Sequence, residues 1–273
     1  MMEAACGVRG ERQRMMGNTC GVRGRKVMEK RTAADEVTET FRPGNRSRSI
    51  LIRLLAVLLL TLSVVPCTAV EANAAASRWS QLRSKYRNKK NTNRLIFVQY
   101  TGGSNCKVYM YKKVKKKKGK YRWERILRCR GYVGRNGIWK TREGDVKTPV
   151  GTFKVTEAFG IYDNPGTSVK YTKLTSSLYW SGEAGTYNTM VDSNVLGHIP
   201  ANSEHLIDYQ PHYNYALNIG YNKENVVGKG SAIFLHCFGS NPYTGGCVAV
   251  SESNMKLIIR NLTKKTRVCI YPK

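Results

Sequence analysis

From Leu95 onward the sequence is a succession of short runs rich in β-branched and aromatic residues, separated by clusters of Gly, Asn, Asp and Pro. Such runs, bounded by turn-forming residues, are typical of β-strands. They lie at 95–100, 106–113, 123–134, 151–161, 213–222, 231–238 and 266–272. This succession predicts a mainly β domain, either a sandwich or a barrel.

One helix is expected, within residues 251–264. Ser251 is a suitable N-terminal cap, and apolar residues follow at the i, i+3, i+4, i+7 spacing of a helix face. These residues are Met255, Ile258, Ile259 and Leu262. Because the helix directly follows the apolar segment that begins at Cys247, we expect it to pack beside the strand formed by that segment.

A histidine lies near the end of the apolar run 231–238, and a cysteine follows a Thr-Gly-Gly turn eleven residues later. A thiol with an ordinary pKa of about 8.5 is a few per cent ionised at neutral pH, so a cysteine nucleophile needs a neighbouring base. Glycines before it can bring backbone N–H groups close to a developing oxyanion. We therefore predict Cys247 as a nucleophile, His236 as its base, and an oxyanion turn at Gly245 and Gly246.

Alternation along the strand 231–238 separates its side chains onto two faces. One face carries Ile233, Leu235 and Cys237, and the other carries Ala232, Phe234 and His236. The side chains of His236 and Cys237 therefore point apart, so Cys237 is not expected to take part in the chemistry.

Residues 1–74 are predicted to be a leader. Twelve mostly apolar residues, Leu54–Val65, follow four arginines and precede Ala-Asn-Ala, a pattern typical of a signal peptide cleaved after Ala74. The run is short compared with the roughly 20 apolar residues of a membrane span. Secretion is therefore expected, with an uncleaved amino-terminal membrane anchor as the alternative. Met28 is an alternative start that would give a more ordinary leader.

Residues 75–94 are polar and basic, and are interpreted as a spacer or a short amphipathic lead-in to a domain at 95–273. The whole chain of 273 residues carries a net charge of +28, and without residues 1–74 it retains 34 basic and 11 acidic residues, or +23. Outside a cell, this charge favours anionic wall polymers or acidic lipid headgroups, although much of it can equally solvate the surface. No nucleic-acid-binding motif is present, so nucleic acid is not an expected partner.

Five cysteines lie outside the predicted leader, and an odd number leaves one thiol unpaired. If the strands around the turn VKKKKGK pair Lys113 with Arg122, Cys106 lies opposite Cys129, which predicts a disulfide across this hairpin. Cys237 and Cys269 form a weaker candidate pair and could equally be buried free thiols.

Four segments in order give the region from Leu95 to Lys273 its resemblance to the YkuD-like catalytic domain of bacterial L,D-transpeptidases. They are GYVGRNG (131–137), EGDVKTPVGTF (143–153), EHLIDYQPHYNYALNIGYN (204–222) and IFLHCFGSNPYTGGCVAV (233–250). The usual family motif is Ser/Thr-His-Gly-Cys followed by an apolar residue and Arg or Asn. Here Gly245 replaces the second histidine, the Arg or Asn is missing, and the connection from His236 to Cys247 is shorter. The chain is therefore identified as a branch of the family.

The resemblance implies a β-sandwich with the cysteine at the base of a cleft, and no cofactor. It implies that Cys247 attacks the carbonyl of the third residue of a peptidoglycan stem tetrapeptide and expels the terminal D-alanine, while His236 transfers the proton. Thr244 occupies the Ser/Thr position of the family and is expected to shape the turn. An amine of a neighbouring stem then resolves the thioester, which forms a crosslink in the cell wall.

Other residues of the resembling segments are weaker candidates. Lys147 and the tyrosines Tyr209, Tyr213 and Tyr215 are candidates for the substrate cleft. The alternative for Lys147 is a turn that only leads into a strand, and the alternative for the tyrosines is a rim or core role. Three histidines recur every seven residues, at His198, His205 and His212, but Pro200 and Pro211 break any helix that would align them. No metal site is therefore expected.

Two other functions remain open from the sequence. The same scaffold could support an L,D-carboxypeptidase, in which water replaces the acceptor amine, or an amidase. A non-catalytic basic module that binds the wall is the third alternative, and the presence of both His236 and Cys247 disfavours it.

Overall fold

The computed structural model describes residues 78–273 of the chain. The predicted leader, the cleavage site and the alternative start all lie outside the described residues. Within this described part, no helix has the length and apolar character needed to cross a membrane.

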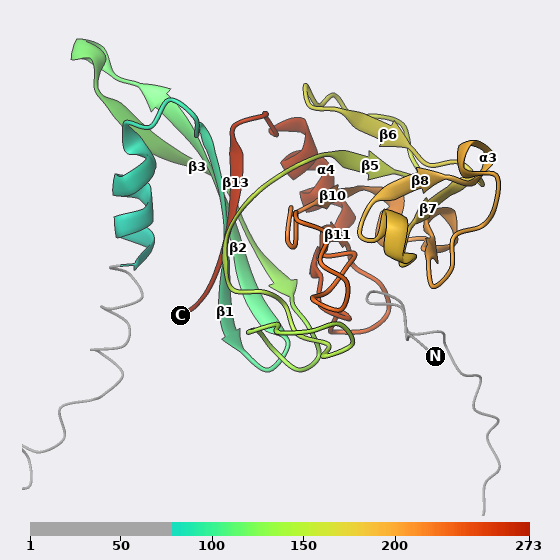
Figure 1. Cartoon of the computed structure of the whole chain (residues 1–273). Helices are drawn as coiled ribbons and strands as arrows, with labels where there is room; N and C mark the ends of the chain where they lie inside the picture. Colours follow the sequence, from blue (N-terminus) through green and yellow to red (C-terminus); the bar gives the residue numbers. More distant parts are fainter. Residues whose placement is uncertain (1–77) are drawn as a thin grey trace, which may run out of the picture. The chain divides into compact units, whose positions relative to one another are not determined.

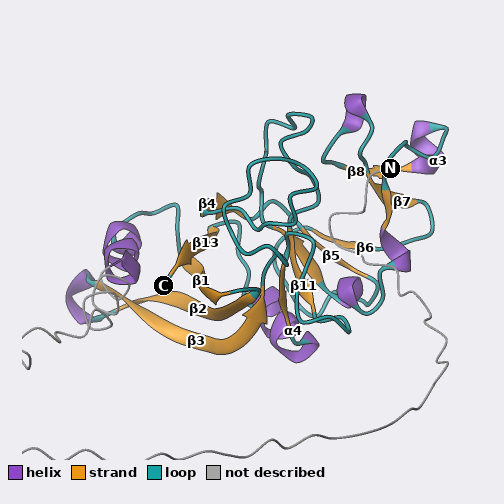
Figure 2. Ribbon diagram, turned by 90° about the horizontal axis from the view of Figure 1, so that it is seen from below, coloured by secondary structure: helices purple, strands orange, loops and turns teal. Residues whose placement is uncertain are grey.

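A mixed sheet of ten strands curls around the core of the described part (Figures 1 and 2). In spatial order its strands are β4 (Gly151–Lys154), β13 (Thr266–Pro272), β1 (Arg94–Gly102), β2 (Asn105–Lys115), β3 (Tyr121–Tyr132), β12 (Val248–Val250), β11 (Phe234–Cys237), β10 (Ala216–Asn218), β5 (Ala158–Gly160) and β6 (Tyr171–Lys173). Three neighbouring pairs, β1 with β13, β11 with β12 and β5 with β6, are parallel, and the others are antiparallel. The prediction of a mainly β fold is confirmed.

A smaller antiparallel sheet has the order β8 (Met190–Asp192), β7 (Leu178–Trp180) and β9 (Glu204–His205). The helical elements between strands are short: α3 (Ser193–Leu196) and 3-10 turns at Lys117–Gly119, Ala184–Thr186, Leu206–Asp208 and His212–Asn214. The single strand expected over 151–161 is divided into β4 and β5, which lie near opposite ends of the large sheet. The chain crosses the molecule between them, which a continuous strand pattern does not reveal.

Residues 78–87 form a helix that packs against the outer face of β1 (Figure 1). The ring of Trp79 lies 4.8 Å from that of Phe97, and the indole N–H of Trp123 donates to the carbonyl oxygen of Arg83 at 2.8 Å. Because the helix covers this face, β1 is buried on both sides and loses the alternation of a half-exposed strand. The segment interpreted as a spacer or lead-in thus contributes an amphipathic helix to the domain.

The hairpin of β2 and β3 has a different register from the predicted one. Cys106 lies opposite Gly131, and Cys129 lies opposite Val108. At the tip Lys113 pairs with Trp123 and not with Arg122, and a bulge between Met110 and Tyr111 shifts the pairing by one more residue, so the predicted register, with Cys106 opposite Cys129, is wrong. Both residues are free thiols in the structure and occupy diagonal positions on the same face.

The predicted carboxyl-terminal helix is confirmed as α4 (Glu252–Arg260). The side chain of Ser251 accepts a hydrogen bond from the N–H of Asn254, which caps the first turn. The buried face of α4 carries Met255, Ile258 and Ile259 and packs against β11, β10 and β3. This helix therefore supports the strand that carries His236 from the opposite side of the sheet.

The two faces of the segment that enters β11 contribute to different cores, as the alternation predicts. Ile233, Leu235 and Cys237 belong to the larger core, which also contains α4. Phe234 belongs to a smaller aromatic core that includes Cys247. The two cysteines that flank the β11–β12 connection are thus buried on opposite faces of the sheet.

Candidate active site

Two neighbouring parallel strands bring His236 and Cys247 to one face of the sheet. His236 in β11 pairs with Ala249 in β12, and Cys247 directly precedes β12. Cys247 therefore lies one strand across and two residues along from His236, which corresponds to roughly 8 Å between their Cα atoms. The short connection that sequence reasoning noted is sufficient to join the two positions.

The thiol of Cys247 is fully buried and contacts the backbone that enters β11. Its Sγ donates a hydrogen bond to the carbonyl oxygen of Ala232 at 3.1 Å and accepts one from the N–H of Phe234 at 3.3 Å. A hydrogen bond from a backbone N–H favours the charged form of an acceptor. The Phe234 N–H is therefore a donor to the thiolate that nucleophilic attack requires, whereas burial and the Ala232 carbonyl oxygen favour the neutral thiol.

The imidazole of His236 is buried, and its tautomer follows from one contact. Its Nδ1 lies 2.7 Å from the carbonyl oxygen of Cys237. Because a carbonyl oxygen can only accept, the proton is on Nδ1, and Nε2 of the neutral ring is the proton acceptor. Sequence reasoning missed this role of Cys237, since alternation concerns its side chain and not its backbone carbonyl.

The turn before Cys247 is organised by the hydroxyl of Thr244. This hydroxyl donates to the carbonyl oxygen of Cys247 at 2.7 Å and accepts from the N–H of Gly246 at 3.1 Å. The backbone of Thr244 is held on both sides, since its N–H donates to Val133 and its carbonyl accepts from the N–H of Arg135. The amide of Gly246 is therefore already engaged, so the amides of Gly245 and Cys247 are the remaining candidate oxyanion donors of this turn.

Gly246 occupies a conformation that requires glycine. Its φ is +141°, and a Cβ atom would lie 3.0 Å from the carbonyl oxygen of Lys147. The backbone of Lys147 thus packs against the nucleophile turn, and its side chain is half-buried. The structure therefore brings this predicted cleft residue to the site through its main chain.

Thr148 is a second support of the nucleophile, a role that sequence reasoning did not predict for it. Its buried hydroxyl donates to the carbonyl oxygen of Cys247 at 3.1 Å and accepts from the N–H of Gly134 at 2.8 Å. Three segments that resemble the family, around Gly134, Thr148 and Cys247, therefore meet at the Thr148 hydroxyl. Only their order along the chain could have suggested this convergence.

The loop that carries Thr148 is fixed by the carboxylate of Asp145. This carboxylate accepts hydrogen bonds from the backbone N–H groups of Thr141, Arg142 and Lys147 and from the ammonium of Lys140 at 2.9 Å. Burial raises the pKa of the Asp145 carboxyl, but these donors outweigh it and hold the pKa below its ordinary value. The Asp145 carboxylate and its donors therefore hold the loop against the turn that precedes Cys247.

The predicted cleft tyrosines have different locations. Tyr213 is fully buried, with its ring 5.8 Å from that of His236, and Tyr209 stacks on Tyr213 at 5.1 Å. Tyr215 packs instead in the larger core, where its carbonyl oxygen accepts a hydrogen bond from Sγ of Cys237. The structure therefore brings Tyr213 and Tyr209 to the site and places Tyr215 on the other face.

A buried carboxyl that sequence reasoning missed lies next to Tyr213. Oε2 of Glu204 accepts a hydrogen bond from the Tyr213 hydroxyl at 2.7 Å, and Oε1 is buried without a hydrogen-bond partner in the described residues. Burial, with the Cys247 and Glu143 side chains adding to it, raises the pKa of the Glu204 carboxyl to about 8. The available signal was an acidic residue, one of two with Asp208, at the start of an aromatic stretch.

The three regularly spaced histidines have separate surroundings. His198 pairs with Glu183 at 3.0 Å, and His205 pairs with Asp208 at 2.9 Å. The ring of His212 lies 5.6 Å from that of His236, and burial together with His236 lowers the pKa of His212 to about 4. Within residues 78–273, no group of three His, Cys, Asp or Glu side chains is arranged to hold a metal ion.

A cavity of about 490 Å³ lies beside the aromatic core that contains the thiol. Trp180 lines this cavity and contacts Phe234, with ring centroids 4.7 Å apart. Asn188 also lines it, and its Oδ1 accepts a hydrogen bond from the N–H of Ala232. Both lining residues thus contact the backbone segment that binds Sγ of Cys247.

Comparison with known proteins shows the family to which this chain belongs. A family model described as the YkuD L,D-transpeptidase catalytic domain matches residues 90–270. One solved structure, described as the Ldtfm-avibactam carbamoyl enzyme, matches 67% of this chain at 17% sequence identity and a TM-score of 0.29. The match covers 50% of that chain, so the present sequence spans about half its length. No curated protein matches. With two thirds of its length matched, this chain belongs to the YkuD family of L,D-transpeptidase catalytic domains.

Proposed function

We propose that this protein is a secreted cysteine acyltransferase that performs L,D-transpeptidation on peptidoglycan stem peptides. The observation that carries the proposal is the tautomer of His236. Its Nδ1–H is directed to the carbonyl oxygen of Cys237, so Nε2 can accept a proton on the face of the sheet that holds the thiol. A positioned base and a buried thiol on one face are the two groups that acyl transfer needs.

Acylation follows from these groups. Nε2 of His236 accepts the thiol proton while Sγ of Cys247 attacks the carbonyl carbon of the third stem residue. The C–N bond to the terminal D-alanine then breaks, and the imidazolium returns the proton to the leaving amine. The products are a thioester on Cys247 and free D-alanine, with the neutral His236 restored.

The tetrahedral intermediate places a negative charge on the former carbonyl oxygen. The amides of Gly245 and Cys247 stand at the nucleophile turn, and the Thr244 and Thr148 hydroxyls hold the Cys247 carbonyl oxygen on its other side. One such oxyanion donor contributes about 3 kcal/mol to catalysis in comparable sites. The rigid turn is therefore expected to supply a large share of the rate.

The second half-reaction is the attack of a side-chain amine of a neighbouring stem on the thioester. The amine forms the new amide bond, its proton passes to His236, and the thiol of Cys247 is regenerated. Water in place of the amine would make the product a free tripeptide and the enzyme an L,D-carboxypeptidase. The reaction takes place at the wall, in agreement with the predicted signal peptide.

The test is to incubate the protein with a stem tetrapeptide and to follow the masses of protein and peptide. A Cys247 adduct followed by crosslinked dimer supports transpeptidation, whereas tripeptide without dimer supports hydrolysis. No adduct and no new product would contradict both and leave wall binding. The Cys247→Ala variant should form no adduct. Cys237→Ala is the matched control, because its thiol lies on the other face, and it should form the adduct as the wild type does.

A further inference from the structure

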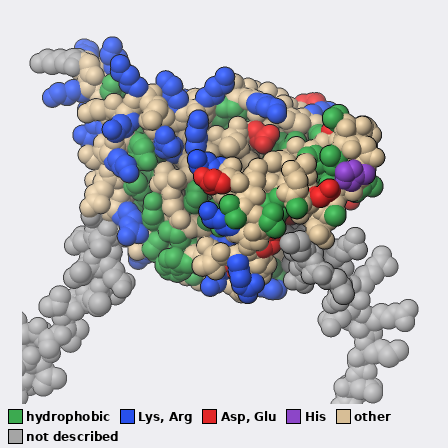
Figure 3. All heavy atoms as spheres, viewed as in Figure 1, with side chains coloured by type: hydrophobic (Ala, Val, Ile, Leu, Met, Phe, Trp, Pro, Cys, Tyr) green, Lys and Arg blue, Asp and Glu red, His purple; other side chains and the backbone are tan. Residues whose placement is uncertain are grey.

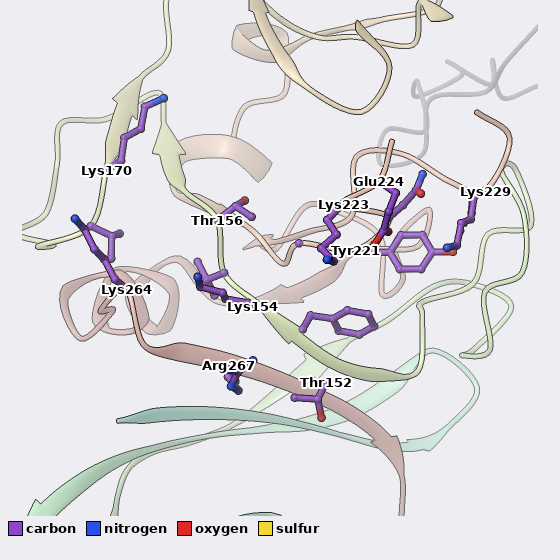
Figure 4. Close-up of a pocket in the computed structure, with 15 residues that line it drawn as sticks. Thr152, Lys154, Thr156, Lys170, Tyr221, Lys223, Glu224, Lys229, Lys264 and Arg267 are labelled. Carbon is purple, nitrogen blue, oxygen red and sulfur yellow. Dashed lines mark hydrogen bonds and ion pairs between the residues drawn. The ribbon is translucent and has the colours of Figure 1, made fainter. Parts of the chain in front are cut away.

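A basic cleft of about 870 Å³ lies away from the thiol, between the end of β4, the loop that follows β10 and the start of β13 (Figure 4). Four separate segments of the chain contribute cations to it. The cations are Lys154, Lys170, Lys223, Lys229, Lys264 and Arg267. One carboxylate, that of Glu224, lines the cleft with them, so the lining carries a large excess of positive charge.

The backbone is arranged to form this cleft. Gly220 has a φ of +81°, and a Cβ atom there would overlap the carbonyl oxygen of Lys154, so glycine allows the loop after β10 to cross close to β4. The rings of Tyr221 and Phe153 then meet edge to face at 6.0 Å, and the Tyr221 hydroxyl donates to the carbonyl oxygen of Lys229 at 2.9 Å. The cleft therefore has a fixed floor.

The protein itself leaves most of this charge unneutralised. Lys223 pairs with Glu224 at 3.4 Å and Lys170 with Glu157 at a longer 3.9 Å. The three remaining lysines, Lys154, Lys229 and Lys264, take part in none of the ion pairs of the described residues and are exposed. Basic side chains also outnumber acidic ones over the face shown in Figure 3. Like charges held together attract counterions, which a multivalent anion releases when it binds.

We propose that this cleft binds a linear polyanion that carries phosphate groups, such as a phosphodiester polymer of the cell wall. Several cations around one cleft exceed what a single monovalent anion can neutralise. Lysine ammonium groups are compact point charges that bind phosphate without demanding the planar geometry of a carboxylate pair. The cationic surface is concave, so it fits a chain better than the flat face of a bilayer.

The position of the cleft determines where a bound polymer would lie relative to the candidate active site. The cavity beside the aromatic core is contiguous with the cleft, since both are lined by Thr156, Lys170, Gly220, Tyr221 and Lys223. A polymer in the cleft would therefore run alongside that cavity. Binding at the cleft does not depend on the thiol and is independent of the proposed transpeptidation.

The experiment measures binding of a short linear inorganic polyphosphate to the full chain by calorimetry at several salt concentrations. The cleft variant is Lys154→Glu/Lys229→Glu/Lys264→Glu. The matched control is Lys115→Glu/Lys116→Glu/Lys117→Glu at the exposed tip of the β2–β3 hairpin, which changes the net charge by the same amount. All six lysines are exposed, and thermal unfolding checks that both variants fold.

We expect the cleft variant to bind about tenfold more weakly or worse, with the tip variant within about threefold of the wild type. The slope of log K against log salt should fall by about one for each cleft lysine removed. Equal losses in the two variants would overturn the proposal, because net charge alone would explain them. Cys247→Ala should bind the polymer as the wild type does.

Three further ligands test the chemistry of the occupant. Orthophosphate should bind far more weakly than the polymer, and so should poly-glutamate of matched charge. Vesicles containing an anionic phospholipid should bind no more strongly to the wild type than to the cleft variant. If poly-glutamate binds as well as polyphosphate, or if the vesicles require the cleft lysines and polyphosphate does not, the proposal is wrong.

Discussion

Cys237 and Cys247 are both buried cysteines at the β11–β12 connection, yet their surroundings differ in every respect that governs reactivity. Cys237 points into the aliphatic core, where burial is the main cause that raises the pKa of its thiol to about 12. Cys247 points to the other face, next to the Phe234 N–H, with His236 on the same face. Burial alone therefore makes a thiol inert, and a reactive thiol also needs a donor, a base and a positioned turn.

The largest effect is expected from His236→Ala, which removes the base from the Cys247 face. General-base catalysis typically contributes about 10²- to 10⁴-fold, so formation of the Cys247 thioester should slow by that factor. The measurement is single-turnover acylation followed by mass. Cys237→Ala retains the carbonyl oxygen that orients His236 and should acylate at close to the wild-type rate. Comparable losses of acylation rate in both variants would contradict the different roles assigned to the two faces of the sheet.

Gly246→Ala should distort the turn without touching either the thiol or the base. The added Cβ must avoid the carbonyl oxygen of Lys147, and the backbone conformation costs about 1–3 kcal/mol for a residue other than glycine. Displacing an oxyanion donor lowers the rate by about 10²- to 10³-fold. The rate and the midpoint of thermal unfolding should both fall. Gly185→Ala is the control, since a Cβ there meets open space, and normal acylation by Gly246→Ala would contradict the assigned turn.

Thr148→Val tests whether the distant loop supports the nucleophile. The substitution keeps the shape, removes one donor to the Cys247 carbonyl oxygen and leaves the Gly134 N–H unpaired, at a cost of about 1–3 kcal/mol. We expect lower stability in denaturant unfolding and a lower maximal acylation rate. Thr152→Val is the matched control, because its hydroxyl contacts Cys269 and Tyr271 on β13. The Thr152→Val variant should lower stability and leave the maximal acylation rate unchanged.

Glu204→Gln should change how stability depends on pH. The pKa of the Glu204 carboxyl is about 8 in the folded protein and 4.5 ordinarily, so between these values the folded state holds a proton that the unfolded state releases. Its contribution to stability is therefore lost as pH rises from 4.5 to about 8. Glutamine stays neutral, so the variant should lose less stability over this window in urea unfolding. The matched control is Asp163→Asn, which removes one exposed carboxylate elsewhere on the surface.

His212→Gln should act in the opposite direction and at lower pH. The pKa of His212 is lowered to about 4 from 6.5, so between these values the unfolded state binds the extra proton. Its contribution to stability is lost as pH falls from 6.5 to about 4. Between pH 6.5 and about 4, the stability of the variant should therefore fall less steeply than that of the wild type in the same urea-unfolding series. Above pH 6.5, the dependence of stability on pH should not change. If the slope of stability against pH between 6.5 and about 4 does not change, His212 is not held neutral.

The sequence was sufficient for features that depend on local pattern. Alternation assigned His236 and Cys237 to opposite faces, and the helical spacing from Met255 to Leu262 predicted α4. The runs of β-branched and aromatic residues predicted the mainly β fold, and the four resembling segments predicted the family.

Features that depend on distant contacts could not be read in this way. Cys106 is displaced from Cys129 by the turn register, in which Lys113 pairs with Trp123, and by the bulge near Met110, which has no residue signature of its own. The burial of Glu204 depends on its contact with Tyr213, and the hydroxyl of Thr148 reaches a carbonyl oxygen 99 residues away. Such contacts exist only after the sheet has assembled.

The complete burial of Cys247 has a kinetic consequence. No substrate carbonyl can reach a side chain with no exposed surface, so an opening step must precede acylation. The turn is fixed by the Thr244 and Thr148 hydroxyls, so we expect the wall that moves to be the aromatic core around the thiol, which includes Tyr213. The rate of thiol labelling should therefore reach a plateau as reagent concentration rises. The height of that plateau measures how often this wall opens, and it should be the same for every small reagent.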